Sequence, residues 1–152
     1  RRQRQMCIRD RIVSCSALQW FVSPELFFKR CNALLSGHGY FAFSTFGKEN
    51  LKEIAAVTGS GLHYYSLEEL KKSLSMHYNI VTAGEERIRL TFATPLDVLY
   101  HLKHTGVTAV CRQAWTKGDL QEFCDKYAKL FSCGNAVTLT YHPLYIIARK
   151  KP

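Results

Sequence analysis

Residues 12–46 contain two short apolar runs separated by one amphipathic helix, and this order restricts the fold more than any other feature of the sequence. The run IVSC (12–15) and the aromatic run YFAFSTFG (40–47) both have the length of a strand. Between them Ser23 precedes Pro24, a pairing typical of a helix N-terminus. A strand–helix–strand order predicts two parallel strands with the helix packed on them, and therefore an α/β fold.

The rest of the chain alternates helices and strands. Four further helices are predicted from their caps and apolar spacing, over residues 48–59, from Ser66, over 94–106 and over 116–131. Segment 78–92 predicts a half-exposed strand, and 137–149 predicts a strand or hairpin interrupted by Pro143. The order predicts one domain whose sheet is parallel early and antiparallel late. Because such sheets bind ligands beyond the carboxyl ends of their strands, the turns after residues 15 and 46 are the expected site.

The first eleven residues, RRQRQMCIRDR, differ from the rest of the chain. They show no hydrophobic period, carry five arginines and one aspartate, and resemble a translated transposon-end adapter used in sequencing-library preparation. We expect residues 1–11 to be a non-native leader, with a disordered basic tail as the alternative. The whole chain has a formal net charge of +9, and residues 12–152 retain 16 basic and 11 acidic residues, which leaves +5.

The sequence lacks the motifs of several functional classes of protein. The six cysteines form no C-x-x-C pair and no zinc-ligand spacing, so we expect reduced thiols and no metal site. No glycine-rich phosphate loop follows a strand and no G-x-S-x-G elbow occurs, so no catalytic residue is assigned. No apolar run reaches the roughly 20 residues of a membrane span, so we expect no membrane association and a cytoplasmic location.

Five segments together resemble one enzyme family. They are IVSCSALQWF (12–21), LLSGHGYFAFSTFGKENLKEI (34–54), LHYYSLEEL (62–70), HLKHTGV (101–107) and LTYHPLYIIARK (139–150). In combination they resemble the malonyl-acyl-carrier-protein O-methyltransferases of biotin synthesis, which are class I S-adenosylmethionine enzymes. The ALQW turn is shared with other small-molecule methyltransferases, whereas HLKHTG and LTYH point to this family.

The resemblance implies a Rossmann-like class I methyltransferase sheet. Residues 12–15 would end its fourth strand and residues 40–46 would form its fifth, so that residues 12–152 supply strands 4 to 7 and a helical insertion. The glycine-rich turn and the acidic residue that hold S-adenosylmethionine would precede Ile12. The resemblance therefore implies a C-terminal fragment that neither binds the methyl donor nor methylates anything by itself.

The implied reaction is methylation of the free carboxylate of malonyl-acyl carrier protein, with S-adenosylmethionine as methyl donor. A carboxylate is already an anion at neutral pH, so the reaction needs alignment rather than a strong base. Gln19 and Trp20 follow the fourth strand and are the expected cofactor contacts, and Gln19 is also expected to contact the substrate. The alternative is a turn-capping glutamine beside a packed tryptophan.

Three further residues are expected to bind the substrate. Lys103 in HLKHTG would pair with the malonyl carboxylate or a carrier-protein phosphate, unless it only complements the dipole of its helix. Tyr141 and His142 in LTYH offer a hydroxyl and an imidazole, with half-buried structural residues as the alternative. The acyl carrier protein is the expected partner, and its predicted docking surface consists of Lys71, Lys72, Lys103 and Arg112.

Two other functions remain open at this point. One is a related methyltransferase that acts on another small carboxylic acid, such as an aconitate-type substrate, although the HLKHTG segment favours the malonyl enzyme. The other is a basic nucleic-acid-binding module, because the chain has 12% aromatic residues and excess lysine. The aromatics lie in apolar runs that predict burial, so no nucleic-acid partner is expected.

Overall fold

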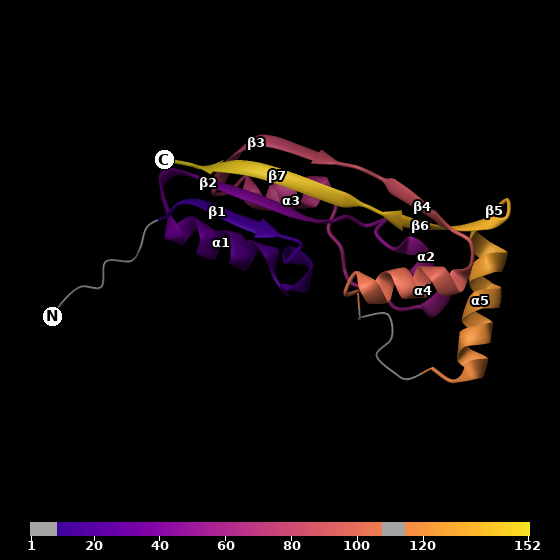
Figure 1. Cartoon of the computed structure of the whole chain (residues 1–152). Coiled ribbons are helices and arrows are strands. Elements are labelled where there is room, and N and C mark those ends of the chain that lie inside the picture. Colours follow the sequence, from indigo (N-terminus) through magenta and orange to yellow (C-terminus); the bar gives the residue numbers. More distant parts are fainter. Residues whose placement is uncertain (1–8, 108–114) are drawn as a thin grey trace. The chain divides into compact units, whose positions relative to one another are not determined.

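The computed structural model of the protein describes residues 9–107 and 115–152, which form two compact units (Figure 1). The first unit consists of residues 9–48, 64–86 and 143–152. The second consists of residues 49–63, 87–107 and 115–142. Most of the predicted leader, residues 1–8, and Arg112 of the predicted docking surface lie outside the described residues.

A four-stranded sheet forms the first unit, with the spatial order β1-β2-β7-β3. Strand β1 (Arg9–Cys15) runs parallel to β2 (Leu35–Phe46). Strand β7 (Pro143–Lys150) is antiparallel to both β2 and β3 (Tyr78–Glu85). The 3-10 helix η1 (Leu18–Trp20) and helix α1 (Pro24–Leu34) connect β1 to β2, and α3 (Leu67–Leu74) precedes β3. The early parallel pair and the late antiparallel strand confirm the sequence-based prediction.

The two helices of the first unit pack on the same face of its sheet. Both contribute to one buried cluster, in which the rings of Phe28 and Phe41 lie 5.9 Å apart. Alternate strand residues point to the opposite face, where Val13 of β1 and Ile147 of β7 both flank Ala42. Val13 is 68% exposed and Ile147 is 37% exposed, so neither α1 nor α3 covers this outward face.

A three-stranded antiparallel sheet and three helices form the second unit. The strands β4 (Ile88–Phe92), β6 (Ala136–Tyr141) and β5 (Ser132–Cys133) lie in that order. The helices are α2 (Lys52–Thr58), α4 (Pro95–His104) and α5 (Lys117–Phe131). Val98, Tyr127 and Leu139 are fully buried in its core. The predicted helical insertion therefore carries a small sheet of its own.

Most helix boundaries follow the local signals that predicted them, but α2 begins at Lys52 and not at residue 48, with no side-chain cap at Leu51. Capping boxes join Ser66 to Glu69 and Thr94 to Asp97, and the Ser23 hydroxyl accepts from the amide of Leu26. A third capping box opens α5. Helix α2 ends at Gly59, whose φ of +67° is a left-handed conformation that favours glycine.

Two predicted strand assignments were wrong. Segment 78–92 is not one strand, because β3 pairs with β7 in the first sheet while β4 pairs with β6 in the second. Segment 137–149 is neither one strand nor a hairpin, because β6 and β7 also belong to different sheets. Strand β1 ends at Cys15, as predicted, and it begins at Arg9, with Arg11 as the register partner of Tyr40. Residues 9–11 of the predicted leader thus lie in β1.

Candidate functional site

The turn after β1 is built around Gln19. Ser16 has a φ of +50°, which turns the chain sharply, and its amide donates to the Ser44 carbonyl at 3.0 Å. The Gln19 side-chain amide donates to the Ser16 carbonyl at 2.7 Å, and its oxygen accepts from the Thr45 hydroxyl at 3.1 Å. Gln19 therefore braces the carboxyl ends of β1 and β2, the edge at which ligands bind in α/β sheets.

Trp20 lies on the surface next to this brace. It is 62% exposed, so it is not the packed core tryptophan of the alternative interpretation. The next residue, Phe21, stacks on Phe27 with ring centroids 4.4 Å apart, which anchors the turn to α1. The indole of Trp20 thus presents an open apolar face on a supported turn.

Tyr141 forms a pair with a histidine that the sequence analysis did not assign. The Tyr141 hydroxyl lies 3.0 Å from Nε2 of His101 on α4, and the His101 ring is 5.1 Å from that of Phe92. His101 and Tyr141 are 40 residues apart, so only tertiary structure brings them together. Lys103 lies two residues further along α4, in its last turn, and is exposed.

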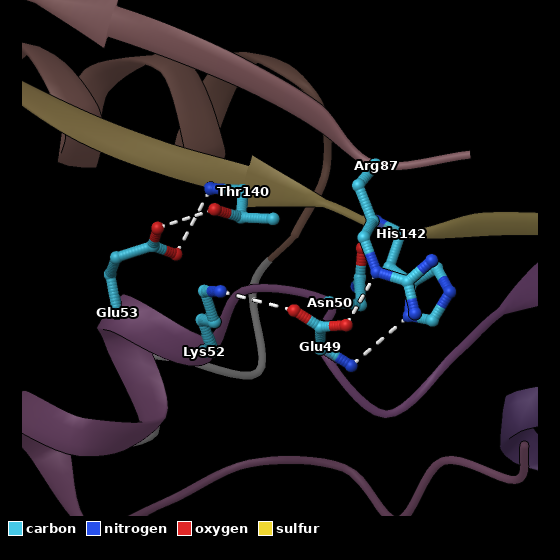
Figure 2. A network of polar contacts seen from close by, with 7 residues as sticks. All are labelled: Glu49, Asn50, Lys52, Glu53, Arg87, Thr140 and His142. Atoms are coloured by element: carbon cyan, nitrogen blue, oxygen red, sulfur yellow. Dashed lines mark hydrogen bonds and ion pairs between the residues drawn. The ribbon is translucent and has the colours of Figure 1, made fainter.

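His142 is only 3% exposed and is held by the turn that follows β2. Its backbone amide donates to the Asn50 side chain at 3.2 Å, and its Nδ1 accepts from the Glu49 backbone amide at 3.2 Å (Figure 2). Because Nδ1 is the acceptor, the proton of the neutral ring is on Nε2. His142 therefore connects the end of β6 to residues 49 and 50.

The carboxylate of Glu49 adds an ion-pair cluster to this turn (Figure 2). It accepts from Arg87 Nε at 2.5 Å and from Lys52 Nζ at 3.1 Å. The hydrogen bond from Arg87, reinforced by Lys52, lowers the pKa of Glu49 from 4.5 to about 2. Glu49 is therefore ionised at neutral pH, where it holds two cations.

Glu53, four residues after Glu49, carries a buried carboxylate. It is 2% exposed, and its two oxygens accept from the Thr140 amide at 2.9 Å and the Thr140 hydroxyl at 2.5 Å (Figure 2). The Leu51 amide also donates to the Thr140 carbonyl at 2.8 Å. Segment 49–53 is thereby fixed to β6 through both backbone and side chains. Sequence reasoning missed this network, because Glu53 lies in a short amphipathic helix where a carboxylate normally points to solvent.

The predicted site residues fall into two groups. Gln19 and Trp20 lie together on the η1 turn of the first unit, whereas Lys103, Tyr141 and His142 belong to the second unit. Among the described residues, no group of three or more His, Cys, Asp or Glu side chains is placed to hold a metal ion. Nor is any described helix both long and apolar enough to cross a membrane.

Several curated proteins that share the same name are similar in sequence to this chain over nearly its whole length. A Bacteroides thetaiotaomicron protein named malonyl-[acyl-carrier protein] O-methyltransferase is 57% identical over 150 residues, which covers 92% of this chain and 58% of the relative. Proteins of the same name from Porphyromonas gingivalis and Haemophilus influenzae are 48% and 42% identical. Each match covers 92% of this chain, and 56% and 54% of those two relatives. The chain thus spans somewhat more than half the length of these relatives.

Solved structures show the same fold. A Bacillus halodurans protein described as a methyltransferase matches with a TM-score of 0.62 at 14% identity. The match covers 96% of this chain and 66% of the Bacillus halodurans chain. The YcgJ protein of Bacillus subtilis matches with a TM-score of 0.56 at 11% identity, and the match covers 96% of this chain and 65% of the YcgJ chain. These likenesses confirm the predicted Rossmann-like α/β fold. No protein-family model matches the chain.

Proposed function

We propose that this chain, a homologue of proteins named malonyl-[acyl-carrier protein] O-methyltransferase, forms part of an S-adenosylmethionine-dependent enzyme that methylates the free carboxylate of malonyl-acyl carrier protein in biotin synthesis. The observation that carries the proposal is the high sequence identity across almost all of the chain. The parallel β1–β2 pair, with a braced turn at its carboxyl end, supports it independently.

Gln19 and Trp20 suit a place beside the methyl donor and the acceptor. The Gln19 amide nitrogen donates one hydrogen bond to Ser16 and its oxygen accepts one from Thr45. An amide offers two donor and two acceptor positions, so Gln19 can orient a ligand while it braces the turn. The exposed indole of Trp20 offers an apolar face. S-adenosylmethionine, when bound, supplies the activated methyl group. These two residues would orient the acceptor carboxylate and exclude water from it.

The proposal also assigns roles to the residues of the second unit. Lys103 is exposed and carries a charge that complements a carboxylate or a phosphate. The Tyr141 hydroxyl would contact the carrier-linked substrate. His142, whose Nδ1 and backbone amide are both bonded to residues 49 and 50, would act by holding the neighbouring Tyr141 in place.

We further propose that the main donor-binding motif lies in the part of the relatives that this chain does not span. The chain by itself then has no measurable affinity for S-adenosylmethionine, which isothermal titration would test. Micromolar binding would contradict this part of the proposal. We also propose a cytoplasmic location for the enzyme. The free thiols of Cys15, Cys31, Cys124 and Cys133 fit a reducing compartment.

A nucleic-acid-binding role has less support from the structure. Stacking on bases requires a row of exposed aromatic rings, yet Phe28, Phe41, Phe43, Tyr78 and Tyr127 are buried. The exposed rings of Trp20, Phe21, Tyr40, Tyr100 and Tyr145 are spread over η1 and the residue after it, β2, α4 and β7. A carboxyl methyltransferase for a different small acid differs only in its acceptor, so the assay itself must separate the two enzymes.

The direct test uses a hybrid in which residues 12–152 replace the matching part of the Bacteroides thetaiotaomicron relative. We expect methyl transfer from S-adenosylmethionine to malonyl-acyl carrier protein, and none to free malonate or aconitate. Transfer to a free acid but not to the carrier-linked substrate would overturn the proposed acceptor.

In the same hybrid, Gln19→Ala should lower the turnover number about tenfold while donor affinity stays nearly unchanged, because the amide aligns the acceptor. Turnover assays and calorimetry with the donor measure the two effects. Thr45→Val is the matched control, because it removes only the hydroxyl that donates to Gln19. If both variants lose turnover equally, Gln19 acts only as a structural brace.

A further inference from the structure

Exposed apolar side chains cluster directly after the Gln19 turn. Val22 is 99% exposed, Trp20 62%, Leu26 50% and Phe21 43%. Apolar side chains scattered singly over a surface are ordinary, but four of them within seven consecutive residues are typical of an interaction surface. They lie at the carboxyl end of β1, beside the proposed acceptor site.

This surface is formed in advance by local contacts. The ring of Phe21 stacks on Phe27, and the Phe21 amide donates to the Leu18 carbonyl at 3.1 Å. The hydroxyl of Ser23 caps the helix by accepting from the Leu26 amide at 3.3 Å. A surface that is already ordered has little conformational entropy to lose when a partner binds.

Two cations extend the apolar surface along α1. The buried positions of this helix include Phe28 and Cys31, and the helical period places Leu26, Lys29 and Arg30 on the opposite, exposed face. Seven residues between positions 20 and 30 are exposed, and one of them, Glu25, is acidic and lies four residues before Lys29. We define the α1 strip by the six apolar and basic ones, which are Trp20, Phe21, Val22, Leu26, Lys29 and Arg30.

Two other cations of the first unit are engaged within the protein. Lys71 pairs with Glu68 at 2.9 Å, so this part of the predicted docking surface is partly neutralised. Lys150 donates to the carbonyls of Asn32 and Leu35 at 2.7 and 2.8 Å, where it caps the end of α1. The α1 strip differs because its cations adjoin exposed apolar side chains.

We propose that the α1 strip is the docking surface for the acyl carrier protein, an inference that rests on the proposed function. Carrier proteins are acidic, so an apolar strip edged by Lys29 and Arg30 complements an acidic helix that carries apolar side chains. Docking at this strip covers Trp20 and brings the carrier next to Gln19, where the malonyl group must be delivered.

The test measures binding of the 152-residue chain to isotope-labelled malonyl-acyl carrier protein from Bacteroides thetaiotaomicron by nuclear magnetic resonance titration. Leu26→Asp and Arg30→Glu should each raise the dissociation constant about tenfold. The matched controls Leu130→Asp and Lys129→Glu lie on α5, where Leu130 is 53% exposed against 50% for Leu26. We expect both controls to stay within about twofold of the unchanged chain, and the affinity to fall with added salt.

Equal effects of strip and control substitutions would overturn the docking proposal, and so would the absence of any binding by the unchanged chain. The hybrid enzyme separates this failure from that of the proposed function. Methyl transfer with an unchanged Michaelis constant in Leu26→Asp would reject the α1 strip and leave the proposed function standing. Strip-dependent carrier binding without methyl transfer would reject the proposed function and leave the docking surface standing.

Discussion

Glu53 is the clearest case of a single side chain that fixes tertiary structure. Its replacement by alanine leaves the buried amide of Thr140 without its acceptor, which should lower the free energy of unfolding by about 1–3 kcal/mol. Glu53→Gln should cost less, because the amide oxygen still accepts from Thr140 and the amide nitrogen can donate to its hydroxyl. Urea denaturation measures both losses.

Glu122→Ala on the exposed surface of α5 is the control for Glu53, and its effect should stay within about 0.5 kcal/mol. If Glu53→Ala is as mild as this control, the carboxylate does not hold segment 49–53 to β6.

Glu49 and Glu69 provide two independent carboxylates with lowered pKa values. Arg87 lowers the pKa of Glu49 to about 2, and Lys48 lowers that of Glu69 to about 2. We expect Arg87→Gln to raise the pKa of Glu49 alone and Lys48→Gln to raise that of Glu69 alone. Carbon NMR of the two carboxyl groups against pH tests both expectations, and a shift of both groups in either variant would contradict them.

The sign of the pH effect follows from these lowered values. A carboxyl whose pKa is lower in the folded chain stabilises the fold above its unfolded pKa of 4.5. That stabilisation is lost as the pH falls from 4.5 through about 2. Arg87→Gln and Lys48→Gln should therefore each make the free energy of unfolding fall less steeply between pH 4.5 and about 2. Near neutral pH, the dependence of this free energy on pH should not change.

At the scale of elements, the start of α5 depends on a capping box. The Thr116 hydroxyl accepts from the Asp119 amide at 3.2 Å, and the Asp119 carboxylate accepts from the Thr116 amide at 2.8 Å. Thr116→Ala should lower the free energy of unfolding by about 1 kcal/mol, because one helix amide loses its acceptor. Thr116→Ser keeps the hydroxyl and should cost much less. Equal losses in thermal unfolding would show that the methyl group, not the cap, matters.

At the scale of the whole chain, the uncovered face of the first sheet should drive self-association. The exposed apolar residues of this face include Val13, Tyr145 and Ile147. In addition, β1 is an edge strand, because among the described strands it pairs only with β2. Sedimentation at rising concentration should show larger species for the unchanged chain, and fewer for Val13→Lys. Met76→Lys, at a 74% exposed position between α3 and β3, is the control. Identical behaviour of the two variants would contradict this expectation.

Part of the candidate site was accessible from the sequence. The turn at Gln19 follows a recognisable strand, so its position could be predicted from the chain direction of an α/β sheet. The partnership of His101 with Tyr141, and that of Glu53 with Thr140, could not be predicted, because these pairs are 40 and 87 residues apart. No local pattern distinguishes a carboxylate that will be buried from one on the polar side of a helix.

The sequence alone predicted the starts of α3 and α4 and the end of α2, because caps such as Ser66, Thr94 and Gly59 act through neighbouring backbone groups. It did not predict the start of α2 at Lys52, where no side chain caps the helix. It also determined the α/β class through the opening strand–helix–strand order. Tertiary structure alone decided that the apolar segments 78–92 and 137–149 each divide between two sheets. Strand pairing is a contact between distant residues, and an apolar run of suitable length is equally able to join either sheet until its partners are in place.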